Sequence, residues 1–202
     1  MQRHGERGVS LISLVIGMTI MLIMFAISAV ATVATQTVNA DQQVRENARH
    51  NADTARAFVV RRLRYAPAAL VALQVAVPAN SVTNPPPSQV YRRATFQIAV
   101  ATDPNGNPVW GPVAALEFIP PAAGQPGRLT YTPDLALEPP IVVATDITEG
   151  FFYFDLGGAT AAVGERALRF RVESSATLSD GSTVVAGSEL GDHTVALRGV
   201  QP

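Results

Sequence analysis

The pattern of hydrophobic and polar positions divides the chain into three stretches. Residues 8–40 contain no charged side chain and consist largely of Leu, Ile, Val, Met and Ala. Residues 39–66 place apolar or small side chains at steps of three and four, the period of a helix with one apolar face. Beyond Pro67, short runs alternate apolar and polar residues with period two, which is typical of strands.

The uncharged stretch is longer than the roughly 20 residues that a helix needs to cross a bilayer. Arg3 and Arg7 precede it and Asp41 follows it, so the positive-inside rule predicts a cytoplasmic N-terminus and an exported remainder. A cleaved secretory signal is the alternative, because "AVATVAT" at 29–35 imitates a small-residue cleavage site. The apolar region of such a signal is only about 7–15 residues long, and the helical pattern here continues beyond it.

The second stretch predicts an amphipathic continuation of the same helix. Its apolar stripe comprises Val44, Ala48, Ala52, Ala55, Val59 and Leu63, and arginines and acidic residues occupy the other faces. No Gly or Pro interrupts residues 18–66, and Pro67 should end the helix near Tyr65. We therefore expect one helix over about 9–65.

The third stretch predicts an antiparallel sheet with one polar face. Alternation is clearest in "VYRRATFQIAV" (90–100), "ALEFI" (115–119), "RLTYT" (128–132) and "ALRFRVE" (167–173), and "SDG" at 179–181 is a hairpin turn. Such a sheet must cover its apolar face, and the helical stripe is the nearest candidate. The fold expected is α+β, with one long N-terminal helix packed by its C-terminal half on an antiparallel β-sheet domain.

Composition narrows the possible chemistry. The 202 residues include no cysteine, which excludes disulfides, zinc–thiolate sites and cysteine nucleophiles. The formal net charge of −1 gives no electrostatic reason to expect a nucleic-acid partner. Arg56, Arg61, Arg62, Arg64, Arg92 and Arg93 form a locally basic zone, which is best explained as a solvated helix end, with contact to DNA phosphates as the alternative.

No catalytic or metal-binding motif stands out. His4, His50 and His193 have no metal-ligand spacing. Asp192 and His193 could be drawn into a hydrolytic triad, but neighbours in a strand point to opposite faces and no G-x-S-x-G elbow is present. We therefore expect no enzyme activity, no cofactor and no metal.

One loop has a partial likeness to a calcium site. In "DPNGNP" (103–108), Asp103, Asn105 and Asn107 imitate the first ligands of a calcium loop. Pro108 and Ala114 occupy the positions where such a loop requires Gly and an acidic residue, so a tight turn is the preferred interpretation.

The N-terminus resembles the signal of type IV pilins and pseudopilins. A basic leader, Gly8, then "VSLI" and a long apolar helix reproduce that signal. The resemblance implies that a prepilin peptidase cuts after Gly8, that Val9 becomes the N-methylated N-terminus, and that the apolar helix is retained. In the family this helix anchors the subunit in the membrane and then packs in the filament core.

The fifth mature position departs from the family, which usually has Glu where this chain has Ser13. In the family that Glu is thought to pair with the N-terminus of an adjacent subunit, and subunits that cap a filament tip are a known exception. Ser13 is therefore either a sign of a tip position or a tolerated loss.

The distal sequence is similar to the ends of J-type minor pseudopilins and W-type minor pilins. The likeness rests on "ITEGFFYFDLGG" (147–158), "RALRFRVESSATL" (166–178) and "HTVALRGVQP" (193–202), where Gly199 replaces the usual Asn. Residues 67–145 resemble no known family.

These observations predict a leader peptide at 1–8, a membrane and filament-core helix at 9–38, its amphipathic second half at 39–66, and an extracytoplasmic β-rich domain at 67–202. The function expected is that of a minor pilin or pseudopilin that primes or caps a type IV pilus or type II secretion pseudopilus. The implied partners are prepilin peptidase, other pilins or pseudopilins, an inner-membrane assembly platform and lipid, with DNA a less favoured partner. The expected location is the inner membrane, with a single pass, and then the filament. The alternative is a membrane-anchored exported binding domain that does not polymerise, and an enzyme on the same anchor is a third possibility.

Overall fold

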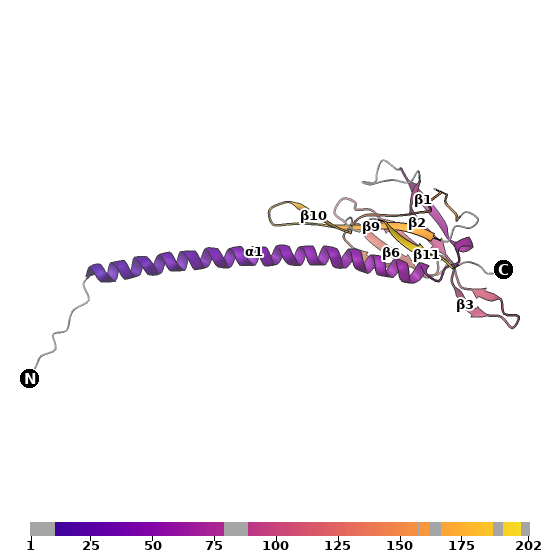
Figure 1. The fold of residues 1–202 in the computed structure, drawn as a ribbon, viewed down its shortest axis with the longest axis horizontal. Coiled ribbons are helices and arrows are strands. Elements are labelled where there is room, and N and C mark those ends of the chain that lie inside the picture. Colours follow the sequence, from indigo (N-terminus) through magenta and orange to yellow (C-terminus); the bar gives the residue numbers. More distant parts are fainter. Residues whose placement is uncertain (1–10, 79–88, 157, 162–166, 188–191, 199–202) are drawn as a thin grey trace, which may run out of the picture. The chain divides into compact units, whose positions relative to one another are not determined.

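The N-terminal part of the chain is one continuous helix. The computed structural model describes residues 11–78, 89–156, 158–161, 167–187 and 192–198. Helix α1 comprises Leu11–Leu63 (Figure 1). The chain separates into two structural units, residues 1–43 and residues 44–202, and α1 contributes to both. The expected helix over about 9–65 is therefore confirmed from residue 11 onward, and it ends two residues earlier than expected.

The end of α1 is set by the residues that follow it. The backbone N–H of Ala66 donates to the carbonyl of Leu63 at 3.0 Å, and Pro67 has no N–H with which to continue the helix. A 3₁₀ turn, η1 (Ala68–Leu70), follows. Arg198 stabilises the turn between α1 and η1. Its N–H donates to the carbonyl of Ala66 and its carbonyl accepts from the N–H of Ala68, both at 3.0 Å.

The second unit is an antiparallel sheet. The strands are β1 (Ala72–Val77), β2 (Val90–Phe96), β5 (Ala114–Ile119), β6 (Arg128–Thr132), β7 (Ile141–Thr145), β8 (Ile147–Tyr153), β9 (Ala167–Thr177), β10 (Thr183–Ala186) and β11 (His193–Ala196). Their order is β10-β9-β8-β2-β5-β6-β7, with β1 paired to β2 and β11 paired to β9. Every pairing between these strands is antiparallel, so the expected α+β class is confirmed.

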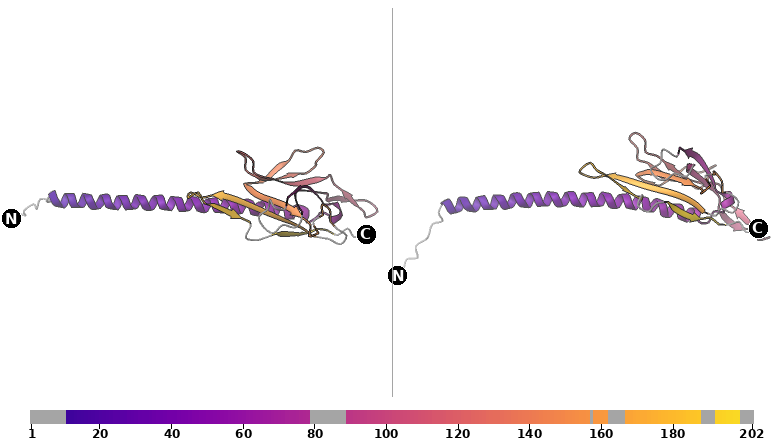
Figure 2. Two further views of the ribbon diagram at one scale, coloured as in Figure 1. Left: turned by 90° about the horizontal axis from the view of Figure 1, so that it is seen from above. Right: turned by 45° about the horizontal axis from the view of Figure 1, so that its top comes forward.

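The C-terminal part of α1 lies along one face of this sheet (Figure 2), and its apolar stripe is the buried side of the helix. Ala48, Ala52, Ala55, Val59 and Leu63 are all buried, and Val44, where the unit begins, is half-buried. Ala55, Val59 and Leu63 share one core with six residues of the sheet: Phe96, Leu116, Leu129, Phe152, Leu168 and Phe170.

One expected strand is in fact two. Residues 90–100 were expected to form a single strand, but β2 ends at Phe96 and a separate hairpin follows, made of β3 (Ala99–Thr102) and β4 (Pro108–Trp110) (Figure 1). The side-chain amide of Gln97 donates to the carbonyl of Gly111 at 2.8 Å, and the N–H of Gly111 donates to the carbonyl of Ile98 at 2.9 Å. These bonds close the base of the hairpin and take the chain out of the main sheet.

The face of the sheet away from α1, called here the outer face, is less polar and less exposed than alternation predicts. Arg171 and Glu173 are polar positions of the alternating run 167–173, which predicts one polar face, but only 5% and 8% of their surfaces are exposed. A second small core of Val77, Val90, Phe151 and Tyr153 explains this burial. Val77 is the last residue of β1 and Val90 the first of β2, so strands other than β8 and β9 contribute to the core on this face.

Candidate functional site: the apolar helix and the polar ladder

The first part of α1 exposes apolar side chains on all sides. From Leu11 to Val38 every large apolar side chain is more than half exposed, and Leu11 reaches 77%. This helix is long and apolar enough to cross a membrane. A helix that is apolar all round is stable only when lipid or other helices cover it, so this segment is the first candidate for function.

The four threonine hydroxyls of this segment are satisfied within the helix. The hydroxyls of Thr19, Thr32, Thr35 and Thr37 each donate to the carbonyl four residues earlier, at 2.8–3.0 Å. Threonine therefore adds no unpaired hydroxyl to the surface of the segment, which suits a medium without water.

The residues of the expected leader cleavage site are only partly described. Gly8 and Val9, the expected cleavage and methylation positions, lie outside the described residues. Ser13 lies near the start of α1 and is exposed. It brings no charge to this surface, in contrast to the Glu of the resembling family.

The outer face carries a ladder of side chains formed by β8 and β9, called here the polar ladder. Three cross-strand pairs make its rungs: Tyr153 with Arg169, Phe151 with Arg171, and Glu149 with Glu173. In the second rung, the guanidinium of Arg171 lies over the ring of Phe151, 5.6 Å from its centroid. Asp155 extends the first rung, since its Oδ1 lies 2.9 Å from Nε of Arg169.

Asp192 ties two rungs of the ladder together. Its Oδ1 accepts from Nε of Arg171 at 2.7 Å, and its Oδ2 accepts from the hydroxyl of Tyr153. The side chains of this ion pair are only 6% and 16% exposed, so little solvent screens it. Burial, and then the hydrogen bond to Asp192, raise the pKa of Tyr153 to about 12, which keeps its hydroxyl a donor.

The third rung opposes two carboxylates, and a β-bulge lies directly beyond it. Ile147 pairs with Ser174 and Glu149 pairs with Glu173, so Thr148 is an extra residue in β8. The three rungs share one register, and the bulge shifts only the pairing of Ile147. Burial, and then the charge of Glu149, raise the pKa of Glu173. Period-two alternation indicates which side chains share this face, but it cannot reveal the bulge beyond the third rung.

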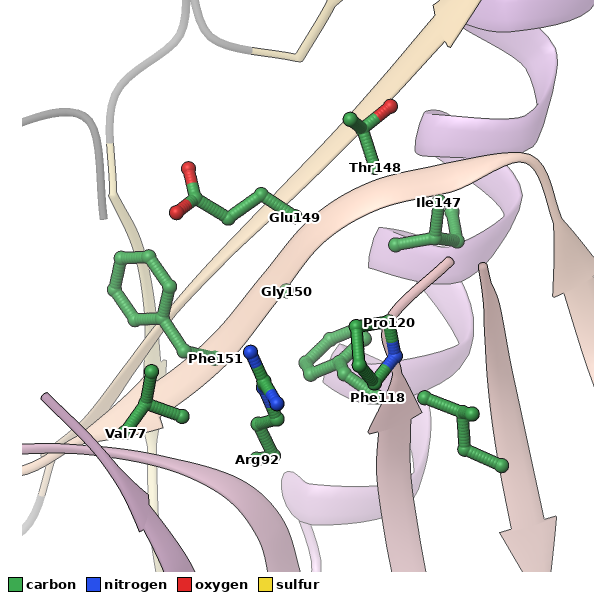
Figure 3. A pocket seen from close by; sticks show the side chains of 10 residues that line it. Val77, Arg92, Phe118, Pro120, Ile147, Thr148, Glu149, Gly150 and Phe151 are labelled. Carbon is green, nitrogen blue, oxygen red and sulfur yellow. The ribbon is translucent and has the colours of Figure 1, made fainter. Parts of the chain in front are cut away.

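A small pocket of about 80 Å³ lies beside the third rung, where β5 separates from β2. Figure 3 shows Glu149 and Phe151 projecting from β8, with Arg92 and Phe118 on the opposite side of the pocket. Gly150 lets β8 pass close to β5, because a Cβ at this position would overlap the ring of Phe118. The pocket is therefore lined by aromatic rings, one carboxylate and one guanidinium.

Asp192 and His193 do not form a catalytic pair. Asp192 faces the polar ladder, whereas the ring of His193 packs on Phe170 in the core beneath α1, with centroids 5.3 Å apart. The two side chains therefore lie on opposite faces, as neighbours in a strand should. Burial, and then the charge of Arg56, lower the pKa of His193.

The loop between β3 and β4 is a tight turn that its own side chains organise. Oδ1 of Asp103 accepts from the N–H groups of Asn105 and Asn107, and its Oδ2 accepts from the side chain of Asn107. Gly106 adopts a φ of 87°, which completes the turn. Within the described part of the chain, no group of three or more His, Asp or Glu side chains is placed to hold a metal ion.

The six arginines of the basic zone do not gather in one place. Arg56, Arg61 and Arg64 line a groove of about 540 Å³ on α1. Arg62 turns toward the sheet and stacks on Phe58 and Tyr131, and Arg93 pairs with Glu117 at 2.6 Å. Arg92 lines the pocket beside Glu149 instead. The structure therefore reduces the expected zone to Arg56 and Arg61 on α1 and Arg64 directly after it.

Comparison of the chain with protein-family models, curated proteins and solved structures finds no match. The long apolar helix, which continues onto an antiparallel sheet, is a pilin-like architecture.

Proposed function

We propose that this protein is a minor pilin or minor pseudopilin, a structural subunit that primes or caps a type IV pilus or a type II secretion pseudopilus. The observation that carries the proposal is α1, whose exposed apolar residues 11–38 continue without a break into a stripe that a sheet covers. A secretory signal that is cut off and discarded does not need to continue as one helix into the folded domain. The leader and Gly8 add sequence support.

The proposed role is assembly rather than catalysis. After prepilin peptidase cuts between Gly8 and Val9, the apolar segment anchors the subunit in the inner membrane with the sheet domain outside. The same segment then packs against the helices of other pilins or pseudopilins, delivered by the inner-membrane assembly platform. Ser13 would leave no carboxylate to pair with the N-terminus of a subunit ahead, which suits a tip position.

The test is the intact mass of the protein purified from membranes of cells with and without a prepilin peptidase. We expect loss of residues 1–8 and one added methyl group on Val9 only when the peptidase is present. A Gly8→Val variant should keep the full-length mass in both strains. A full-length wild-type protein in both strains would refute the proposal, and cleavage near Ala31 would indicate a secreted protein.

The second candidate is a single-pass protein with an exported binding domain that never polymerises. The polar ladder and its pocket favour it, because they form a distinct surface on the sheet rather than on α1. Under this alternative the anchor remains uncut, so the same mass measurement separates the two candidates.

A further inference from the structure

The groove at the C-terminal end of α1, called here the arginine groove, combines positive charge with an apolar floor. Its lining includes three arginines, one carboxylate and two small apolar side chains: Arg56, Arg61, Arg64, Asp53, Ala57 and Val60. None of the three guanidinium groups has an ion pair or a hydrogen bond with another described residue. With one carboxylate against three guanidinium groups, the groove has a net charge of +2 and suits a ligand that is both acidic and apolar.

The loop between β6 and β7, called here the acidic loop (residues 133–140), has the opposite character. It places Leu137 between Asp134 and Glu138, and it contains no arginine or lysine. Leu137 is 84% exposed, more than any other large apolar side chain of the described residues. Neither carboxylate has an ion pair with another described residue, so the loop has a net charge of −2.

The acidic loop has a fixed conformation before it meets a partner. Oδ1 of Asp134 accepts from the N–H of Ala136, and the carbonyl of Asp134 accepts from the N–H of Glu138, both at 2.9 Å. Pro133 and Pro139 restrict the backbone on either side of this turn. A loop that is ordered in advance loses little conformational entropy when it binds.

The arginine groove and the acidic loop lie on opposite sides of the sheet domain. Burial, and then the charge of Arg56, lower the pKa of His193, so the groove lies on the β11 side of α1. Phe58, on the other side of the helix, packs against Tyr131 of β6 with ring centroids 5.3 Å apart, and the acidic loop follows β6. Strands β9, β8, β2 and β5 separate β11 from β6. One copy of the chain therefore cannot place its own loop in its own groove.

We propose that copies of this chain associate head to tail, with the acidic loop of one copy seated in the arginine groove of the next. Leu137 then covers the apolar floor, and the carboxylates of Asp134 and Glu138 meet the arginines. The two net charges are equal and opposite, and the groove of about 540 Å³ has room for the turn that carries Leu137. A nucleic acid would satisfy the arginines alone and would leave the apolar floor and the carboxylate of Asp53 without suitable partners.

This contact is heterologous, because the two surfaces that meet are different. Each pair of copies keeps one free groove and one free loop, so a further copy can add at either end. The inference goes beyond the proposed function: it concerns the sheet domain rather than residues 11–38, and it does not depend on cleavage after Gly8. The intact mass and the experiment below therefore test separate statements.

The test uses the absence of cysteine from the chain, since disulfides can then form only between introduced thiols. Full-length proteins with Ala57→Cys or Leu137→Cys, each with a different affinity tag, are produced together in the same membranes and treated with a mild oxidant. We expect a disulfide that joins the two tagged proteins. Leu156→Cys, at a leucine that is 76% exposed, is the matched control for Leu137→Cys and should not be joined to Ala57→Cys. A yield no higher than that of the control would overturn the proposal.

A charge exchange separates the proposed contact from chance collision. Arg61→Glu, added to the protein with Ala57→Cys, should reduce the cross-link to the yield of the control. Glu138→Arg, added to the protein with Leu137→Cys, should then restore part of it. Cross-linking that persists with Arg61→Glu alone would show that the contact does not use the groove and would overturn the proposal.

Sedimentation of the full-length protein in detergent gives an answer without introduced cysteines, should one of those variants fail to fold. We expect a larger assembly for wild type than for Leu137→Lys, and equal masses would refute the contact. Binding of duplex DNA that Arg61→Glu abolishes, without a cross-link between copies, would assign the arginines to nucleic acid instead.

Discussion

At the scale of single residues, His193 makes the fold sensitive to acid. Its ring lies in the core, and burial, with Arg56 nearby, lowers its pKa below the usual 6.5, although Asp192 and Asp53 oppose that shift. The unfolded chain therefore takes up a proton more readily than the folded chain. The stability that neutral His193 contributes is present above about pH 6.5 and is lost as the pH falls through its folded pKa.

We expect the unfolding midpoint of wild type to fall more steeply below pH 6.5 than that of His193→Gln, whose side chain does not titrate. Thermal melts of both proteins in a series of buffers measure the difference. His50→Gln, on the exposed side of α1, should follow wild type. Parallel curves for His193→Gln and wild type would show that His193 does not control this response.

Gly150 allows a test of the close packing between β8 and β5. A Cβ here would enter the ring of Phe118, so Gly150→Ala should force β5 and β8 apart. Overpacking of this kind costs about 1–3 kcal/mol of unfolding free energy. The same substitution at Gly17, where no atom lies within 4 Å of an added Cβ, is the control and should leave the melt of the sheet domain unchanged.

At the scale of elements, the packing of α1 on the sheet depends on its stripe rather than on its length. Leu63 is fully buried in the core, whereas Tyr65, two residues on, is 55% exposed. Leu63→Ala should lower the unfolding free energy by about 2–5 kcal/mol, because it leaves a cavity between helix and strands. Tyr65→Ala should change it by less than about 0.5 kcal/mol. Urea titration measures the unfolding free energy of both variants. Equal decreases for the two would contradict the assignment of Leu63 to the buried stripe.

The polar ladder predicts a similar contrast between two aspartates. Asp192→Ala removes the carboxylate that binds Arg171, a side chain only 6% exposed, and should cost at least about 2 kcal/mol. Asp155→Ala breaks a pair whose side chains are 43% and 51% exposed, and solvent screening should limit its cost to less than about 1 kcal/mol. Denaturant curves that rank the two variants in the reverse order would show that Asp192 is not the centre of the ladder.

At the scale of the whole molecule, the periodicities anticipated much of the fold. The stripe of 44–63 belongs to one helix and the alternation of 128–132 to one strand. Each element buries one side of its own surface, so the local pattern was sufficient to predict both. The break after Phe96 and the bulge at Thr148 depend on pairing with distant strands, and no local pattern reveals them. For the same reason the buried state of Arg171 and Glu173 was missed, since it requires the second core around Phe151.

The separation of the chain into two units gives the last prediction. Residues 44–202 contain the buried stripe, the sheet and both cores, whereas residues 11–43 contribute exposed apolar side chains. A chain that begins at Val44 should therefore be soluble without detergent and unfold cooperatively, near the midpoint of the full-length protein. A chain that begins at Arg56 loses Ala48, Ala52 and Ala55 from the stripe and should unfold at a clearly lower temperature. Scanning calorimetry of the two truncated proteins tests both statements. If the protein that begins at Val44 were unfolded, the sheet domain would depend on the apolar segment for more than anchoring.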